Sequence, residues 1–66
     1  MPFIQVTMLE GRPVEKKHAL MKELTEAAVR ALGSDPESIR VAIYEVSPEE
    51  WSVAGVPMST IRAQNG

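Results

Sequence analysis

One stretch of helical spacing, between two stretches rich in β-branched residues, most constrains the fold of this chain. From Pro13 to Leu32, apolar side chains recur three and four residues apart, and charged side chains lie mostly between them. Pro13 suits the first turn of a helix, where an N–H has no intrahelical partner. Gly33 is typical of the residue that ends one. The pattern predicts one helix, in one domain that spans residues 1–66.

The flanking stretches, Pro2 to Leu9 and Ile39 to Val46, have the composition of β-strands. In the first stretch both alternating sets contain apolar residues, which is typical of a strand that is covered on two sides. The order strand, helix, strand predicts an α+β fold built on a single βαβ unit. Its strands should be parallel and its crossover right-handed.

The remainder of the chain has a weaker pattern. We expect Ser47 to Glu50, which contains Pro48, to form a turn, with a helical turn as the alternative. Trp51 to Gly66 carries apolar residues without a clear period. We expect it to form a short hairpin or arm that docks on another subunit, with Ala63 to Gly66 frayed.

We expect the fold to need a further source of stability, because a hydrophobic core of this size rarely suffices without disulfides, a metal or oligomerisation. There is no cysteine, which excludes disulfides, and the only histidine, His18, has no carboxylate cluster around it, so no metal site is expected. Hydrophobic residues make up 44% of the chain, which is more than one small core can bury and therefore also favours oligomerisation. Because two strands do not form an independent sheet, we predict a homo-oligomer, with dimerisation by sheet extension.

Charge and hydropathy argue against two classes of partner. The net charge is −2 and there is no basic tract, so nucleic-acid binding has little electrostatic support. No apolar run approaches membrane-spanning length, and no signal peptide is visible. We therefore expect a cytoplasmic protein with no membrane partner.

Pro2 is a candidate catalytic group, because it directly follows Met1. An initiator methionine is usually removed when the next residue is small, and its removal here would leave a free secondary amine. Unperturbed α-amino groups have a pKa of about 7.7–8.0, and burial and nearby cations lower such a pKa. Pro2 could then act as a general base. Many chains begin Met-Pro without any such role, and with Met1 attached the nitrogen is an amide.

Two arginines and a tryptophan are further candidates. Arg40 lies in the apolar run of the second strand, and a buried guanidinium needs a partner. That partner is either a glutamate, for example from another subunit, or an anionic ligand such as a carboxylate. Arg12, taken alone, is an ordinary loop arginine. Trp51 fits interface packing or the wall of an apolar pocket. Tyr44 and Ser38 share a strand face with Arg40, and packing is the simpler role for Tyr44.

Taken together, these features resemble the 4-oxalocrotonate tautomerase family. The resemblance rests on Pro2, on the run Leu9-Glu10-Gly11-Arg12 and on Ser38-Ile39-Arg40, and it covers nearly the whole chain. It implies a small βαβ subunit that assembles as a homohexamer, a trimer of dimers. It implies a 2-hydroxymuconate tautomerase-like isomerase of aromatic hydrocarbon catabolism, with a small-molecule substrate and no metal or organic cofactor.

The resemblance also implies a role for each candidate residue. Pro2 would take a proton from the enol of an unsaturated 2-hydroxy acid and return it to another carbon. Arg40 would bind the 2-hydroxy or carbonyl region and the adjacent carboxylate, and Arg12 the distal carboxylate. The remaining residues near the substrate would be Trp51, Leu9 and Ser38.

Some residues depart from the family pattern. Trp51 stands where well-known members carry phenylalanine, Pro13 replaces a more polar helix start, and residues 52–55 replace a glycine-rich turn. A family member with another substrate therefore stays open, either a biosynthetic tautomerase or a haloacrylate dehalogenase. Glu49 and Glu50 lie near the position of the dehalogenase acid, but the surrounding motif differs. A non-catalytic oligomeric module is the third alternative.

Overall fold

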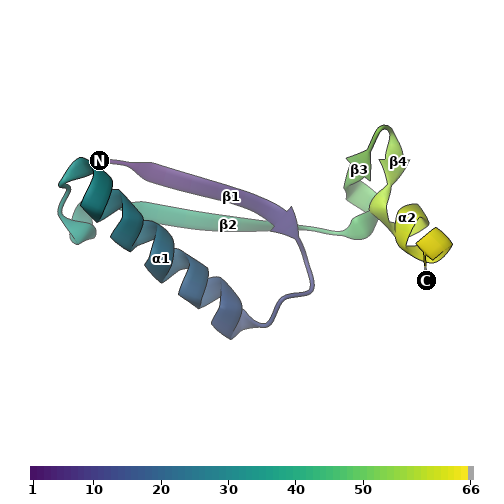
Figure 1. Cartoon of the computed structure of the whole chain (residues 1–66), viewed down its shortest axis with the longest axis horizontal. Coiled ribbons are helices and arrows are strands. Elements are labelled where there is room, and N and C mark those ends of the chain that lie inside the picture. Colours follow the sequence, from purple (N-terminus) through teal and green to yellow (C-terminus); the bar gives the residue numbers. More distant parts are fainter. Residues whose placement is uncertain (66) are drawn as a thin grey trace.

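The computed structural model describes residues 1–65 and has the predicted βαβ order (Figure 1). Strands β1 and β2 pair in parallel, and α1 connects them. β1, α1 and β2 each begin one residue later than the sequence predicted, and they end at the predicted residues. The elements are β1 (Phe3–Leu9), α1 (Val14–Leu32), the 3₁₀ turn η1 (Pro36–Ser38), β2 (Arg40–Val46), the 3₁₀ turn η2 (Pro48–Glu50), β3 (Ser52–Val53), β4 (Val56–Pro57) and α2 (Met58–Asn65).

Both ends of α1 follow from local sequence. Pro13 is the extended N-cap rather than the first helical residue, because its φ of −66° is accompanied by a ψ of 153°. Gly33 adopts a left-handed φ of 69°, and its N–H donates to the carbonyl of Val29 at 2.9 Å. An ion pair of 2.7 Å between Lys17 Nζ and Glu45 Oε1 links the start of α1 to β2.

Helix α1 covers one face of the two-stranded sheet. The β1 residues on this face, Ile4, Val6 and Met8, are half-buried. Among the described residues only Ala28 of α1 and Ile39, just before β2, are buried, at 9% and 7% exposure. The core of one subunit is therefore small, as the length of the chain led us to expect.

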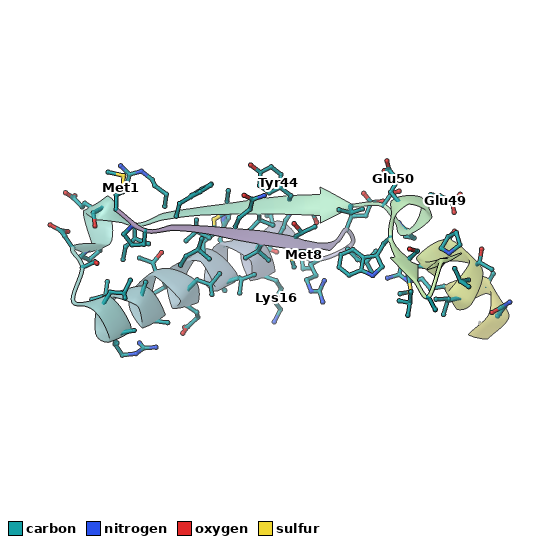
Figure 2. The ribbon with its side chains drawn as sticks, turned by 90° about the horizontal axis from the view of Figure 1, so that it is seen from above. Met1, Met8, Lys16, Tyr44, Glu49 and Glu50 are labelled. Atoms are coloured by element: carbon teal, nitrogen blue, oxygen red, sulfur yellow. The ribbon has the colours of Figure 1, made fainter. Side chains whose placement is uncertain are left out.

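The opposite face of the sheet is open. Figure 2 shows Met1 and Tyr44 on the side of the sheet away from α1. In β1, Phe3 is on this face with 60% of its surface exposed, and Tyr44 of β2 is 50% exposed. Within one subunit, the prediction that β1 is covered on two sides is therefore wrong, because the single long helix can cover only one face.

Residues 47–65 form a C-terminal arm that extends beyond the end of β2 (Figure 1). Its strands β3 and β4 make the predicted hairpin, and Ala54 and Gly55 in the turn have φ of 54° and 81°. Two positive φ angles are typical of the tight turns that suit hairpins. Helix α2 was not predicted, because its apolar residues are too few for a clear period. Ala63 to Asn65, where fraying was expected, belong to α2, and Gly66 lies outside the described residues.

The subunit is extended for its size. Its radius of gyration is 15.3 Å, whereas about 11 Å is expected for a compact domain of this length. Its accessible surface is 4832 Å², against about 4,200 Å² for a folded monomer of this mass. No helix in the described part of the chain is long and apolar enough to cross a membrane. The subunit therefore exposes more surface than a compact monomer of the same mass.

We expect Ile39→Ala to lower the free energy of unfolding by about 2–5 kcal/mol, because it leaves a cavity beneath α1. Urea denaturation at one fixed protomer concentration measures this, since assembly contributes to stability. Val14→Ala is the matched control, because Val14 is 52% exposed. Equal losses in the two variants would show that Ile39 is not part of the core.

Candidate active site

Three of the six predicted site residues gather where both strands begin. Pro2 is half-buried just before β1, and its carbonyl accepts a hydrogen bond of 3.0 Å from the backbone N–H of Arg40. Ser38 lies two residues before Arg40, and its Oγ donates to the carbonyl of Asp35 at 2.8 Å. Met1 is 87% exposed. While Met1 is attached, the nitrogen of Pro2 is a tertiary amide and has no basicity.

The guanidinium of Arg40 is held by backbone carbonyls. Its Nη1 donates to the oxygen of Glu37 at 2.6 Å and to that of Ile39 at 3.4 Å. Nε and Nη2 make no hydrogen bond within residues 1–65. The expected burial is wrong for the subunit, because Arg40 is exposed at the first position of β2. The sequence analysis missed Glu37, although Asp35-Pro36 just before it is typical of the start of a helical turn.

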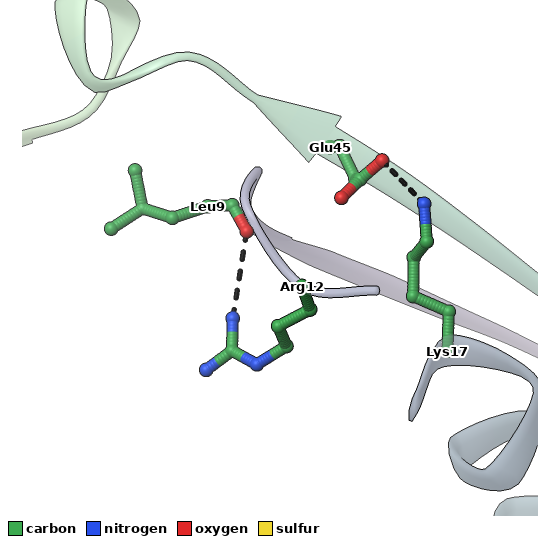
Figure 3. Close-up of polar contacts among 4 residues, drawn as sticks. All are labelled: Leu9, Arg12, Lys17 and Glu45. Carbon is green, nitrogen blue, oxygen red and sulfur yellow. Dashed lines mark hydrogen bonds and ion pairs between the residues drawn. The ribbon is translucent and has the colours of Figure 1, made fainter. Parts of the chain in front are cut away.

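The other three residues lie where the strands end. The exposed side chain of Arg12 folds back so that Nη1 donates to the carbonyl of Leu9 at 3.5 Å (Figure 3). Between them Gly11 has a φ of 126°, which is a conformation that side chains rarely permit. Trp51 follows η2 and is half-buried, and its carbonyl accepts a hydrogen bond of 2.6 Å from the backbone N–H of Met58.

The length of β1 separates the two groups. This strand has seven residues, and at about 3.3 Å per residue it spans roughly 20 Å. Pro2 and Arg12 lie beyond opposite ends of it (Figure 1). One small substrate therefore cannot contact both residues of the same subunit. Pro2 and a guanidinium thus lie at one end, and a second guanidinium and an indole lie at the other.

Two hollows of the subunit lie away from these residues. One groove runs along α1 between the helix and the chain near Pro36, and a smaller hollow lies between the start of α1 and β2. Neither is lined by any predicted site residue. His18 is exposed on α1, as expected. In residues 1–65 no three histidine, aspartate or glutamate side chains are grouped to hold a metal.

Comparison with known proteins identifies the class. The sequence pattern of tautomerase enzymes matches residues 2–61. A probable tautomerase of Ralstonia nicotianae is 55% identical over 94% of this chain and 89% of its own length. The 2-hydroxymuconate tautomerase of Comamonas testosteroni is 46% identical over 85% of this chain and 89% of its own length. These matches span nearly the whole βαβ unit and the arm.

Solved structures agree with this class. TomN, a 4-oxalocrotonate tautomerase homologue in the tomaymycin biosynthetic pathway, has a TM-score of 0.95 and 42% identity, and the match covers 98% of this chain and all of that one (100%). A heterohexameric 4-oxalocrotonate tautomerase from Chloroflexus aurantiacus has a TM-score of 0.89 and 39% identity, over 94% and 100% of the two chains. The relatives that share this parallel βαβ unit with a C-terminal hairpin are tautomerases, which are isomerases. The chain belongs to the tautomerase family, among the relatives of 4-oxalocrotonate tautomerase.

We expect Gly11→Ala to lower the free energy of unfolding by about 1–3 kcal/mol, because the φ of Gly11 is strained for any other residue. No atom within 4 Å would meet the new methyl group, so the loss would come from the backbone alone. Thermal or urea denaturation measures it. The neighbouring exposed residue provides a control in Glu10→Ala, and a similar loss in that variant would rule out backbone strain as the cause.

Proposed function

We propose that this protein is a cofactor-independent keto–enol tautomerase whose general base is the amino-terminal nitrogen of Pro2, freed by removal of Met1. Its substrate is an unsaturated 2-hydroxy or 2-oxo acid, and a dicarboxylate such as 2-hydroxymuconate fits best. The observation that carries the proposal is the hydrogen bond between Arg40 N–H and the carbonyl of Pro2. It keeps the chain terminus beside the backbone of Arg40. The high exposure of Met1 supports its removal.

The reaction needs one base and fixed positive charge. The nitrogen of Pro2 takes the proton of the 2-hydroxyl group, so that an O–H bond breaks, and returns it to a distant carbon of the conjugated chain as a C–H bond. Nothing is oxidised or reduced. Arg40 binds the 2-oxo region and the adjacent carboxylate, where negative charge develops. Arg12 binds the distal carboxylate and draws electron density along the conjugated system.

The complete site forms between subunits of a homohexamer. Support comes from the separation of Pro2 and Arg12 along β1, which lets one substrate reach both only if they belong to different copies. The open face of the sheet and the protruding arm offer apolar surface for such contacts. Leu9, Trp51 and Ser38 then line the site and keep water from the amine.

Trp51 leaves a second substrate class open. Its indole is larger than the phenyl ring of phenylalanine, and a relative with 42% identity functions in a biosynthetic pathway. A substrate of a biosynthetic tautomerase would differ mainly in the groups that contact this ring. Steady-state rates on a panel of enol acids, with and without a second carboxylate, distinguish the two classes. A preference for 2-hydroxymuconate would support the dicarboxylate.

We expect Pro2→Ala to lower kcat/KM for ketonisation of 2-hydroxymuconate by about 10²–10⁴-fold, the usual contribution of a general base. The decay of the dienol absorbance measures the rate. Intact mass of the untagged protein should show that Met1 is absent. Unchanged turnover, or a native chain that keeps Met1, would exclude Pro2 as the base. Val14→Ala is a control outside the proposed site.

We also expect Pro2→Ala and Arg12→Ala subunits to restore activity when they are unfolded and refolded together. Random pairing in a closed oligomer would leave about one quarter of the sites with both residues intact. Each variant refolded alone is the control. If the mixture is as inactive as its components, Pro2 and Arg12 do not act across a subunit boundary.

A further inference from the structure

The 3₁₀ turn η1 connects an aspartate to the guanidinium of Arg40 through four hydrogen bonds. Asp35 is the extended N-cap of η1, and its Oδ1 accepts from the backbone N–H of Glu37 at 3.0 Å. The carbonyl of Asp35 accepts from the N–H of Ser38 at 2.9 Å and from its Oγ at 2.8 Å. On the other side of the same residue, the carbonyl of Glu37 accepts from Arg40 Nη1 at 2.6 Å.

This arrangement determines which edge of the guanidinium is free. Nη1 is bound to the carbonyls of Glu37 and Ile39, and no described residue accepts from Nε or Nη2 of Arg40. The edge formed by Nε and Nη2 matches the two oxygens of a carboxylate in a bidentate pair. The backbone of η1 therefore leaves available the edge that a carboxylate substrate needs.

The turn is also connected to the terminus. The N–H of Arg40 donates to the carbonyl of Pro2 at 3.0 Å, and the N–H of Ile39 donates to the carbonyl of Pro36 at 3.1 Å. A change in the path of η1 would thus move the Arg40 side chain relative to Pro2. The Asp35 side chain is exposed and makes no ion pair within residues 1–65, so its described role is to cap the turn.

We propose that Asp35 is a positioning residue for substrate binding, because its cap of η1 holds the Glu37 carbonyl that orients Arg40. This inference rests on the proposed function, in which Arg40 binds a substrate carboxylate. Asp35 acts through its acceptor oxygen rather than through its charge. An asparagine at this position keeps the oxygen and the preference for capping, whereas an alanine keeps neither.

The test compares Asp35→Ala with Asp35→Asn, each alone and combined with Arg40→Ala, in the assembled full-length protein. We expect Asp35→Ala to lower kcat/KM for 2-hydroxymuconate about fivefold, mainly through KM, as loss of one cap implies. Asp35→Asn should stay within about twofold of the parent, given the similar rank of both residues as caps. Glu23→Ala, which removes an exposed carboxylate from α1, is the control for charge.

The combined variants distinguish positioning from a general loss of stability. Added to Arg40→Ala, the Asp35→Ala change should have no further effect on kcat/KM, because the group that it orients is gone. If Asp35→Ala does not assemble, Asp35→Gly replaces it, since glycine is tolerated at caps nearly as well as a polar residue but has no acceptor.

Each other result overturns a specific claim. If Arg40→Ala strongly lowers kcat/KM but Asp35→Ala does not, or if the two losses add fully, Asp35 does not position Arg40 and the proposed function stands. An Asp35→Asn variant as impaired as Asp35→Ala would show that charge, rather than the cap, is required. If Arg40→Ala is as active as the parent, both the role of Arg40 in the proposed function and this inference are wrong.

Discussion

The packing of one helix on one face of a two-stranded parallel sheet is the interaction on which the rest of the structure depends. It buries Ile39 and Ala28 but leaves the other face of the sheet exposed, including Phe3 and Tyr44. A sheet of two strands is marginal without further cover. The radius of gyration and the exposed arm agree with a subunit that completes its core by association. In the proposed homohexamer, stability would therefore depend on protomer concentration.

The same geometry has a chemical consequence. Parallel pairing brings the two strand beginnings together, so Pro2 lies beside Arg40, and it brings the two strand ends together, so Leu9 and Arg12 lie near the start of the arm. Cationic side chains are thus present at both ends of an apolar sheet. In the proposed site, the beginning of the sheet in one subunit and the end of the sheet in another each supply half of a pocket for an elongated dianion. The length of β1 prevents one subunit from supplying both halves of the same pocket.

Much of the subunit was predictable from local chemistry. The proline and glycine at the ends of α1, and the β-branched residues of β1 and β2, act within a few residues and therefore leave clear patterns. Helix α2 was missed because it is short and its apolar residues are too few to show a helical period. The exposed state of Arg40 was missed because an apolar run does not reveal that its first residue lies at the end of the sheet.

The sequence by itself determined the βαβ order, the family resemblance and the identity of the candidate base and arginines, because these depend on spacing and residue type. Only the tertiary structure decided that the six candidate residues divide between two ends of the sheet, and that the Glu37 carbonyl holds Arg40 Nη1. The reason is physical. The path of η1 and the directions of the two arginine side chains are set by hydrogen bonds to backbone carbonyls, and a pattern of residue types along the chain does not reveal these bonds.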